Sequence, residues 1–130
     1  MRTFNSGATR DTDKGKPDYK GYLSALVIKR FGQYMLKHQE QKDGTQRSSD
    51  NWKKGIPEEV YVSSLARHHE DLQLYFEGFS EEMVETVEES LCAIIFNAQG
   101  LLYEILKENI TESEKNKAEN EQEEIPYWGC

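Results

Sequence analysis

The sequence has few cysteines, no long apolar run and little that resembles a targeting segment. Its two cysteines, Cys92 and Cys130, cannot form a disulfide framework, which favours a reducing, intracellular setting. No apolar run is long enough to cross a membrane. The first residues lack the apolar segment of a secretory signal peptide. We therefore expect a cytoplasmic protein that makes no membrane contact.

Signatures of the common enzyme classes are also missing. The sequence has no Gly-rich phosphate loop, no zinc-ligand spacing and no arrangement typical of a nucleophilic serine or cysteine. A net charge of −8 argues against direct binding of a polynucleotide. The negative charge does not exclude binding of a nucleotide, because a metal ion between carboxylates and phosphates reverses the local sign of the charge. Any chemistry should then be metal-assisted hydrolysis.

Apolar residues recur at helical spacing in three stretches of the sequence. They predict helices over Tyr19–Lys37, Pro57–Phe76 and Ser80–Leu106. Residues 1–17 are polar and predict an irregular arm. Residues 39–56 predict a polar loop, and a loop of this length is usually functional or disordered.

The length and the helical pattern predict an all-α fold in one domain, a small bundle of three main helices over residues 1–108. Residues 109–130 are acidic, and they predict a frayed helix extension or a flexible tail. The apolar segment 125–130 could dock on the domain or on a partner. The third helix carries more apolar surface than two partner helices would cover, so we expect a homodimer or homotetramer assembled through it.

Four ionisable residues fall on or beside the predicted apolar faces. His68 lies in the middle of one face and Asp71 at its edge, while Glu85 and Glu88 lie at the margin of the other. Carboxylates three residues apart on a helix can share one cation, and two such helices side by side form an oxygen-rich site for Mg²⁺ or Mn²⁺. We predict a catalytic site in which Asp71, Glu85 and Glu88 hold the metal and His68 orients Asp71 or a water.

Each of these four residues also has a structural interpretation. Glu85 and Glu88 could simply belong to the charged flank of a helix in a glutamate-rich chain, and His68 could be a core histidine held by hydrogen bonds. Asp71 fits a salt bridge with Arg67 or Arg30. A buried carboxylate without a partner is costly, so either role requires a partner for each group.

Substrate-binding residues are predicted from charge and from aromatic and amide chemistry. Arg30 lies on an apolar stripe and needs an anionic partner, a carboxylate or a phosphate. Trp52 could stack on a base or fill the core, and Asn97 could bind a base edge or cap a loop. Three cations of the arm could clamp phosphates or remain unspecific: Arg10, Lys14 and Lys16.

Five blocks of the sequence together resemble a known family. They are Gly7–Asp11, Lys14–Pro17, Asn51–Pro57, Arg67–His68 and Leu91–Ala98. Their combination covers about residues 5–107. It resembles the phage dATP/dGTP diphosphohydrolase N-terminal domain family, which is similar in kind to the MazG-like, all-α nucleotide pyrophosphohydrolases.

The resemblance implies a site for Mg²⁺, Mn²⁺ or Co²⁺ made by Glu-x-x-Glu on one helix and Glu-x-x-Asp on the other. Glu85 and Glu88 match one pair, and His68 and Asp71 stand at the other, where histidine departs from the glutamate of the family. The implied reaction converts a purine deoxynucleoside triphosphate, dGTP or dATP, to the monophosphate and pyrophosphate. In phages that replace adenine by 2-aminoadenine, such an enzyme supplies dGMP and lowers dATP in the host cytoplasm.

Two other functions fit the same sequence. A non-catalytic acidic phage protein would use its tail and third helix to bind a host protein. A nucleotide sensor would bind dGTP with metal and leave it intact.

Overall fold

Helices dominate the computed structural model, which describes residues 1–119. The long helices are α2 (Ala25–Lys37), α3 (Glu58–Phe76) and α4 (Val87–Glu119). Among the described residues, the only sheet is a hairpin of two short strands, which confirms the predicted all-α class. The predicted docking segment, 125–130, lies outside the described residues.

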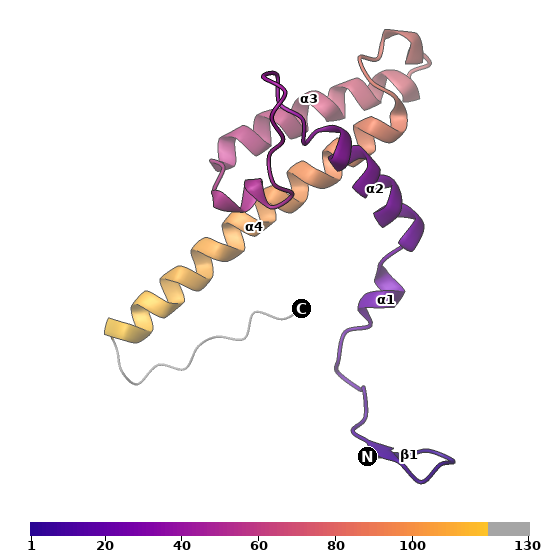
Figure 1. The fold of residues 1–130 in the computed structure, drawn as a ribbon, viewed down its shortest axis with the longest axis vertical. Coiled ribbons are helices and arrows are strands. Elements are labelled where there is room, and N and C mark those ends of the chain that lie inside the picture. The colour runs from indigo at the N-terminus through magenta and orange to yellow at the C-terminus, as the bar shows by residue number, and fades with distance from the viewer. Residues whose placement is uncertain (120–130) are drawn as a thin grey trace.

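The core lies where α3 and α2 pack on the first half of α4 (Figure 1). Tyr61 of α3 is 1% exposed, and its ring meets Phe96 of α4 edge to face at 6.2 Å between centroids. Tyr34 of α2 packs against Cys92 and Ala93 of α4. The second half of α4 extends beyond this packed region (Figure 1).

The first predicted helix is divided in two, which corrects the single helix expected over residues 19–37. Helix α1 spans Tyr19–Tyr22, and Leu23 is extended before α2 begins. The hydroxyl of Ser24 accepts a hydrogen bond from the Val27 N–H at 3.3 Å, so Ser24 caps a new helix. A serine side chain that binds its neighbouring backbone competes with continuation of the preceding helix.

Helix α4 begins at Val87, so the start predicted at Ser80 is wrong. Residues Ser80–Glu82 form one turn of 3₁₀-helix. The true start is a capping box, in which the Glu89 N–H donates to the Thr86 hydroxyl at 3.1 Å and the Thr86 N–H donates to the Glu89 carboxylate at 3.3 Å. Glu85 therefore precedes the helix. At its other end, α4 continues through residues 109–119.

The predicted arm and loop both contain short ordered elements. Strands β1 (Arg2–Thr3) and β2 (Thr9–Arg10) pair antiparallel, and their hairpin lies apart from the helices (Figure 1). A bridge joins Glu40 to Gln46, and a 3₁₀-helix spans Asn51–Lys54. This loop therefore folds back on itself before α3 begins.

Helix α4 exposes a stripe of apolar residues. Leu91, Ile95, Leu102 and Ile105 are all exposed, and Ala98 lies between them at alternating spacings of four and three residues. This repeat is typical of a helix that packs against another helix. Within residues 1–119, no helix is both long and apolar enough to cross a lipid bilayer.

The close contact between Tyr61 and Gly100 predicts the effect of a single methyl group. A Cβ at Gly100 would overlap the Tyr61 ring, so we expect Gly100→Ala to destabilise the protein by about 1–3 kcal/mol. Gly32 of α2 has open space around its Cα, and Gly32→Ala should stabilise by up to about 1 kcal/mol. Urea unfolding followed by circular dichroism measures both changes. Equal unfolding midpoints for the two variants would contradict this packing.

Candidate functional site

The predicted catalytic residues of α3 meet the segment that leads into α4. The Asp71 carboxylate accepts hydrogen bonds from the backbone N–H groups of Val84 at 3.0 Å and Glu85 at 3.4 Å. The ring Nδ1–H of His68 donates to the Glu85 carboxylate. We call residues 77–86, between α3 and α4, the link. Asp71 thus fixes the backbone of the link, and His68 fixes the Glu85 side chain.

Ser90 joins the two carboxylates from the first turn of α4. Its side chain is fully buried, and its hydroxyl lies 3.3 Å from Glu85 Oε1 and 3.5 Å from Asp71 Oδ2. One hydroxyl proton serves one acceptor at a time, so the two carboxylates share this donor. His68, Asp71, Glu85 and Ser90 form what we call the acidic cluster.

Glu88, the third predicted metal ligand, lies outside the acidic cluster. Its carboxylate accepts from the Arg30 Nε–H at 2.7 Å, and its side chain is 72% exposed. The hydrogen bond to Glu88 raises the pKa of Arg30. Arg30 therefore has the anionic partner that its apolar position required. Within residues 1–119, no three His, Cys, Asp or Glu side chains are grouped to hold a metal ion.

A second ion pair holds α2 against the start of α4. Lys37 Nζ lies 3.1 Å from Glu89 Oε2, and Glu89 is also the acidic residue of the capping box. The hydrogen bond from Lys37, followed by those with Thr86, holds the pKa of Glu89 below its ordinary value of 4.5. These bonds join the end of α2 to the start of α4.

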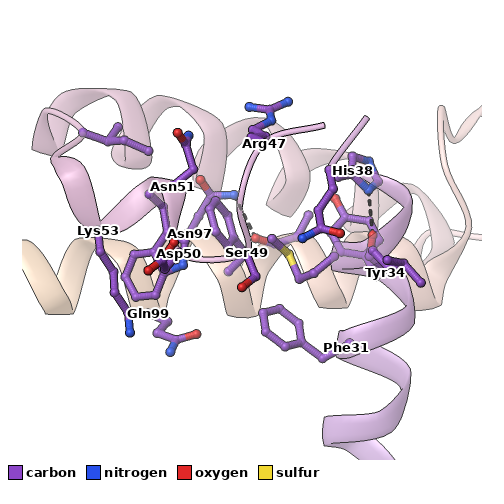
Figure 2. Close-up of a pocket in the computed structure, with 18 of the residues that line it drawn as sticks. Phe31, Tyr34, His38, Arg47, Ser49, Asp50, Asn51, Lys53, Asn97 and Gln99 are labelled. Atoms are coloured by element: carbon purple, nitrogen blue, oxygen red, sulfur yellow. Dashed lines mark hydrogen bonds between the residues drawn. The ribbon is translucent and has the colours of Figure 1, made fainter. Parts of the chain in front are cut away.

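A cavity of about 820 Å³ opens between α2, α4 and the loop that precedes α3 (Figure 2). Trp52 and Asn97, both predicted at the base, line this cavity together with His68. His68 is the residue that connects the two features, since it lines the cavity and also bonds to Glu85.

Trp52 and Asn97 also have partners within the fold. The Trp52 ring meets Tyr103 at 5.0 Å and Phe96 at 6.2 Å between centroids, both edge to face. Asn97 is buried, and its Nδ2 donates to the Ala93 carbonyl at 2.8 Å. The side-chain oxygen Oδ1 of Asn97 makes no hydrogen bond within residues 1–119, so the amide can still accept one from a ligand.

Sequence reasoning missed several polar residues that the loop and α2 bring to the cavity. Figure 2 shows them beside Asn97 and Phe31: His38, Arg47, Asp50, Asn51 and Lys53. Arg47 forms no ion pair with the described residues, whereas Lys53 Nζ lies 5.6 Å from the centre of the Trp52 ring. The loop length and its tryptophan were the available signals, and neither identifies Arg47.

The three predicted cations of the arm do not reach the cavity of their own chain. Arg10, Lys14 and Lys16 are exposed and are absent from the cavity lining. Their side chains form no ion pair within residues 1–119. The structure therefore separates these residues from Trp52 and Asn97.

Two groups near the cavity are poorly suited to act as nucleophiles. Burial raises the pKa of the Cys92 thiol, and burial together with Glu85 raises the pKa of Tyr34 to about 12. Both groups are therefore protonated near neutral pH.

Comparison of the chain with protein-family models, curated proteins and solved structures gave no match. The family resemblance in the sequence blocks therefore stays a prediction.

The lowered pKa of Glu89 predicts a pH-dependent contribution to stability. Ionised Glu89 stabilises the fold, so its contribution is present above pH 4.5 and is lost as the pH falls through the lower folded-state pKa. We expect Glu89→Gln to lower the free energy of unfolding at neutral pH. The difference from the wild type should shrink to zero in acid.

Urea unfolding at a series of pH values measures this difference. Glu70→Gln is the matched control, because Glu70 is exposed on α3 and has no ion-pair partner among the described residues. A difference for Glu89→Gln that stays constant from neutral to acid pH would contradict the role of its charge.

Proposed function

We propose that the protein is a metal-dependent pyrophosphohydrolase that converts dGTP or dATP to the monophosphate and pyrophosphate. The main supporting observation is the double role of His68, which lines a cavity and bonds to a carboxylate of the acidic cluster. The cavity of about 820 Å³ is within the range of small-molecule sites, roughly 300–1,000 Å³. A ligand in it would lie beside the acidic cluster.

The donor chemistry of the acidic cluster suits Mg²⁺, Mn²⁺ or Co²⁺. Asp71, Glu85 and the Ser90 hydroxyl supply oxygen atoms, and Mg²⁺ is commonly held by one or two carboxylates together with waters and substrate phosphates. Glu88 can join them by leaving Arg30, because an exposed ion pair adds little stability. A bound metal would activate a water for attack on the α-phosphorus and offset phosphate charge.

The other cavity residues have roles that follow from their chemistry. Trp52 supplies an aromatic surface for a base, and Asn97 supplies a hydrogen-bond acceptor for its edge. Arg47, which has no ion-pair partner among the described residues, supplies a guanidinium for phosphate oxygens. Arg30 becomes available to phosphate when Glu88 turns away. His68 acts as a positioning residue that holds Glu85.

The apolar stripe of α4 supports a homodimer or homotetramer. Leu91, Ile95, Leu102 and Ile105 are exposed on one copy, and a second α4 would cover them. The family resemblance further supports a place in phage 2-aminoadenine nucleotide metabolism, with the protein in the host cytoplasm.

The reaction is tested by incubating the purified protein with each deoxynucleoside triphosphate and Mg²⁺ or Mn²⁺. We expect monophosphate and pyrophosphate from dGTP or dATP, separated by ion-exchange chromatography. Glu85→Gln should reduce turnover to background, because it removes a metal-binding charge, while Glu70→Gln should leave turnover unchanged. Intact nucleotides with both metals would contradict the proposal, and intact nucleotide bound with metal would indicate a sensor.

Glu88 is tested separately because its carboxylate pairs with Arg30. Glu88→Gln keeps an acceptor for Arg30, so we expect the helical content to stay at the wild-type level while turnover falls to background. Circular dichroism and the product assay measure the two quantities. Wild-type turnover in this variant would limit the role of Glu88 to the ion pair.

Arg47 is the proposed phosphate contact of the loop. Loss of one charge-assisted hydrogen bond costs about 1.5–3 kcal/mol, so Arg47→Ala should raise the KM for dGTP by about tenfold or more. Lys42→Ala is the matched control, since Lys42 belongs to the same loop and does not line the cavity. Equal KM values for the two variants would exclude Arg47 from the phosphate site.

A further inference from the structure

The arm, residues 1–17, folds locally and packs on no other part of residues 1–119. Every residue from 1 to 16 is exposed. Its bonds stay within the arm, as in the hydrogen bond from Phe4 N–H to the Ala8 carbonyl at 2.8 Å and that from Arg2 Nε–H to the Asp11 carbonyl at 2.9 Å. Figure 1 shows the hairpin well away from the helices. A two-stranded hairpin alone is only marginally stable in water, so this arm needs a surface to dock on.

The segment that joins the arm to the core is apolar and uncovered. Tyr22 is 85% exposed and Leu26 is 78% exposed. The neighbouring exposed apolar residues are Tyr19, Leu23, Val27 and Ile28. Contiguous apolar surface of this kind marks an interaction site. The arm and the face that follows it are therefore both suited to contact another molecule.

The charge of the arm indicates what that molecule is. The arm has four basic and two acidic side chains, a net charge of +2, so the remainder of the chain carries −10. A second copy of this chain offers the acidic surface that complements the arm. Two copies that exchange arms reciprocally form a closed, symmetric pair.

The cavity, in turn, has few cations for a triphosphate. One arginine, Arg47, and one lysine, Lys53, line the cavity, and Lys53 lies against the Trp52 ring. The arm carries three cations without ion-pair partners in the described residues, Arg10, Lys14 and Lys16. We infer that the arm of one copy docks on a second copy and brings these cations to phosphate groups in that copy's cavity. The identity of the phosphate ligand rests on the proposed function.

Complementation between two defective variants tests this exchange. One copy carries Glu85→Gln and keeps its arm, and the other carries Arg10→Ala, Lys14→Ala and Lys16→Ala and keeps its acidic cluster. Each variant alone should be nearly inactive. Co-refolded in equal amounts, they should recover about a quarter of wild-type activity, the share of intact sites expected when two copies pair at random.

The matched control mixes Glu85→Gln with Asp71→Asn, which damage the same cluster and should restore nothing. We expect the arm variant to keep its helical core, because the three substituted side chains are exposed. No recovery in the arm mixture, with mixed oligomers confirmed by mass, would overturn arm exchange. Full activity of the arm variant by itself would overturn it as well.

A second readout does not depend on hydrolysis. Isotope-labelled and unlabelled wild-type copies are mixed and treated with a carbodiimide, which joins lysines to carboxylates in direct contact. Arm exchange predicts cross-links between labelled and unlabelled peptides that contain Lys14 or Lys16. Such cross-links without any nucleotide hydrolysis would support arm docking and refute the proposed enzyme. Hydrolysis with cross-links only inside one copy would support the enzyme and overturn the exchange.

Discussion

The Asp71 carboxylate fixes the link between α3 and α4, and the rest of the site depends on that link. It accepts hydrogen bonds from the N–H groups of Val84 and Glu85, two donors of a non-helical segment. Hydrogen bonds to a charged acceptor are stronger than those between neutral groups. With this backbone held, Glu85 turns toward His68 and Ser90. One aspartate therefore sets both the entry into α4 and the second carboxylate of the acidic cluster.

The start of α4 then positions the cavity. The capping box of Thr86 and Glu89 begins the helix, and Lys37 binds the same Glu89 from α2. Because α2 forms one wall of the cavity, the contact that caps α4 also shapes the space beside His68. The helix start, the end of α2 and one wall of the cavity are thus connected through Glu89.

Much of the helical fold follows from the sequence, whereas the division of residues 19–37 into two helices and the true start of α4 were missed. The span of α3 agrees with its apolar spacing to within one residue. The start of α4 was placed at Ser80, although Met83 stands three residues later, where a full capping box has Glu or Gln. The sequence Thr86-x-x-Glu89 is such a full capping box, and it marks the true start. Ser24 likewise begins α2 through a local side-chain bond that apolar periodicity does not detect.

Helical spacing predicted only part of the candidate site, since Glu88 of α4 lies outside the acidic cluster, while Trp52 of the loop was predicted from its chemistry and does line the cavity. Asp71 and Glu85 were expected together from helical spacing, and they do meet, although Glu85 reaches the cluster from the link. Arg47 belongs to a loop, where no period relates sequence to position. Its place at the cavity depends on how that loop folds back, which is a property of the tertiary structure.

Direct binding of Mn²⁺ to the acidic cluster tests the central claim, because it does not require turnover. Electron paramagnetic resonance of free Mn²⁺, titrated against the wild type and Glu85→Gln, measures occupancy with and without dGTP. We expect a saturable site in the wild type that dGTP strengthens and that Glu85→Gln loses. Absence of saturable Mn²⁺ binding in the wild type, with dGTP present, would contradict a metal-dependent hydrolase.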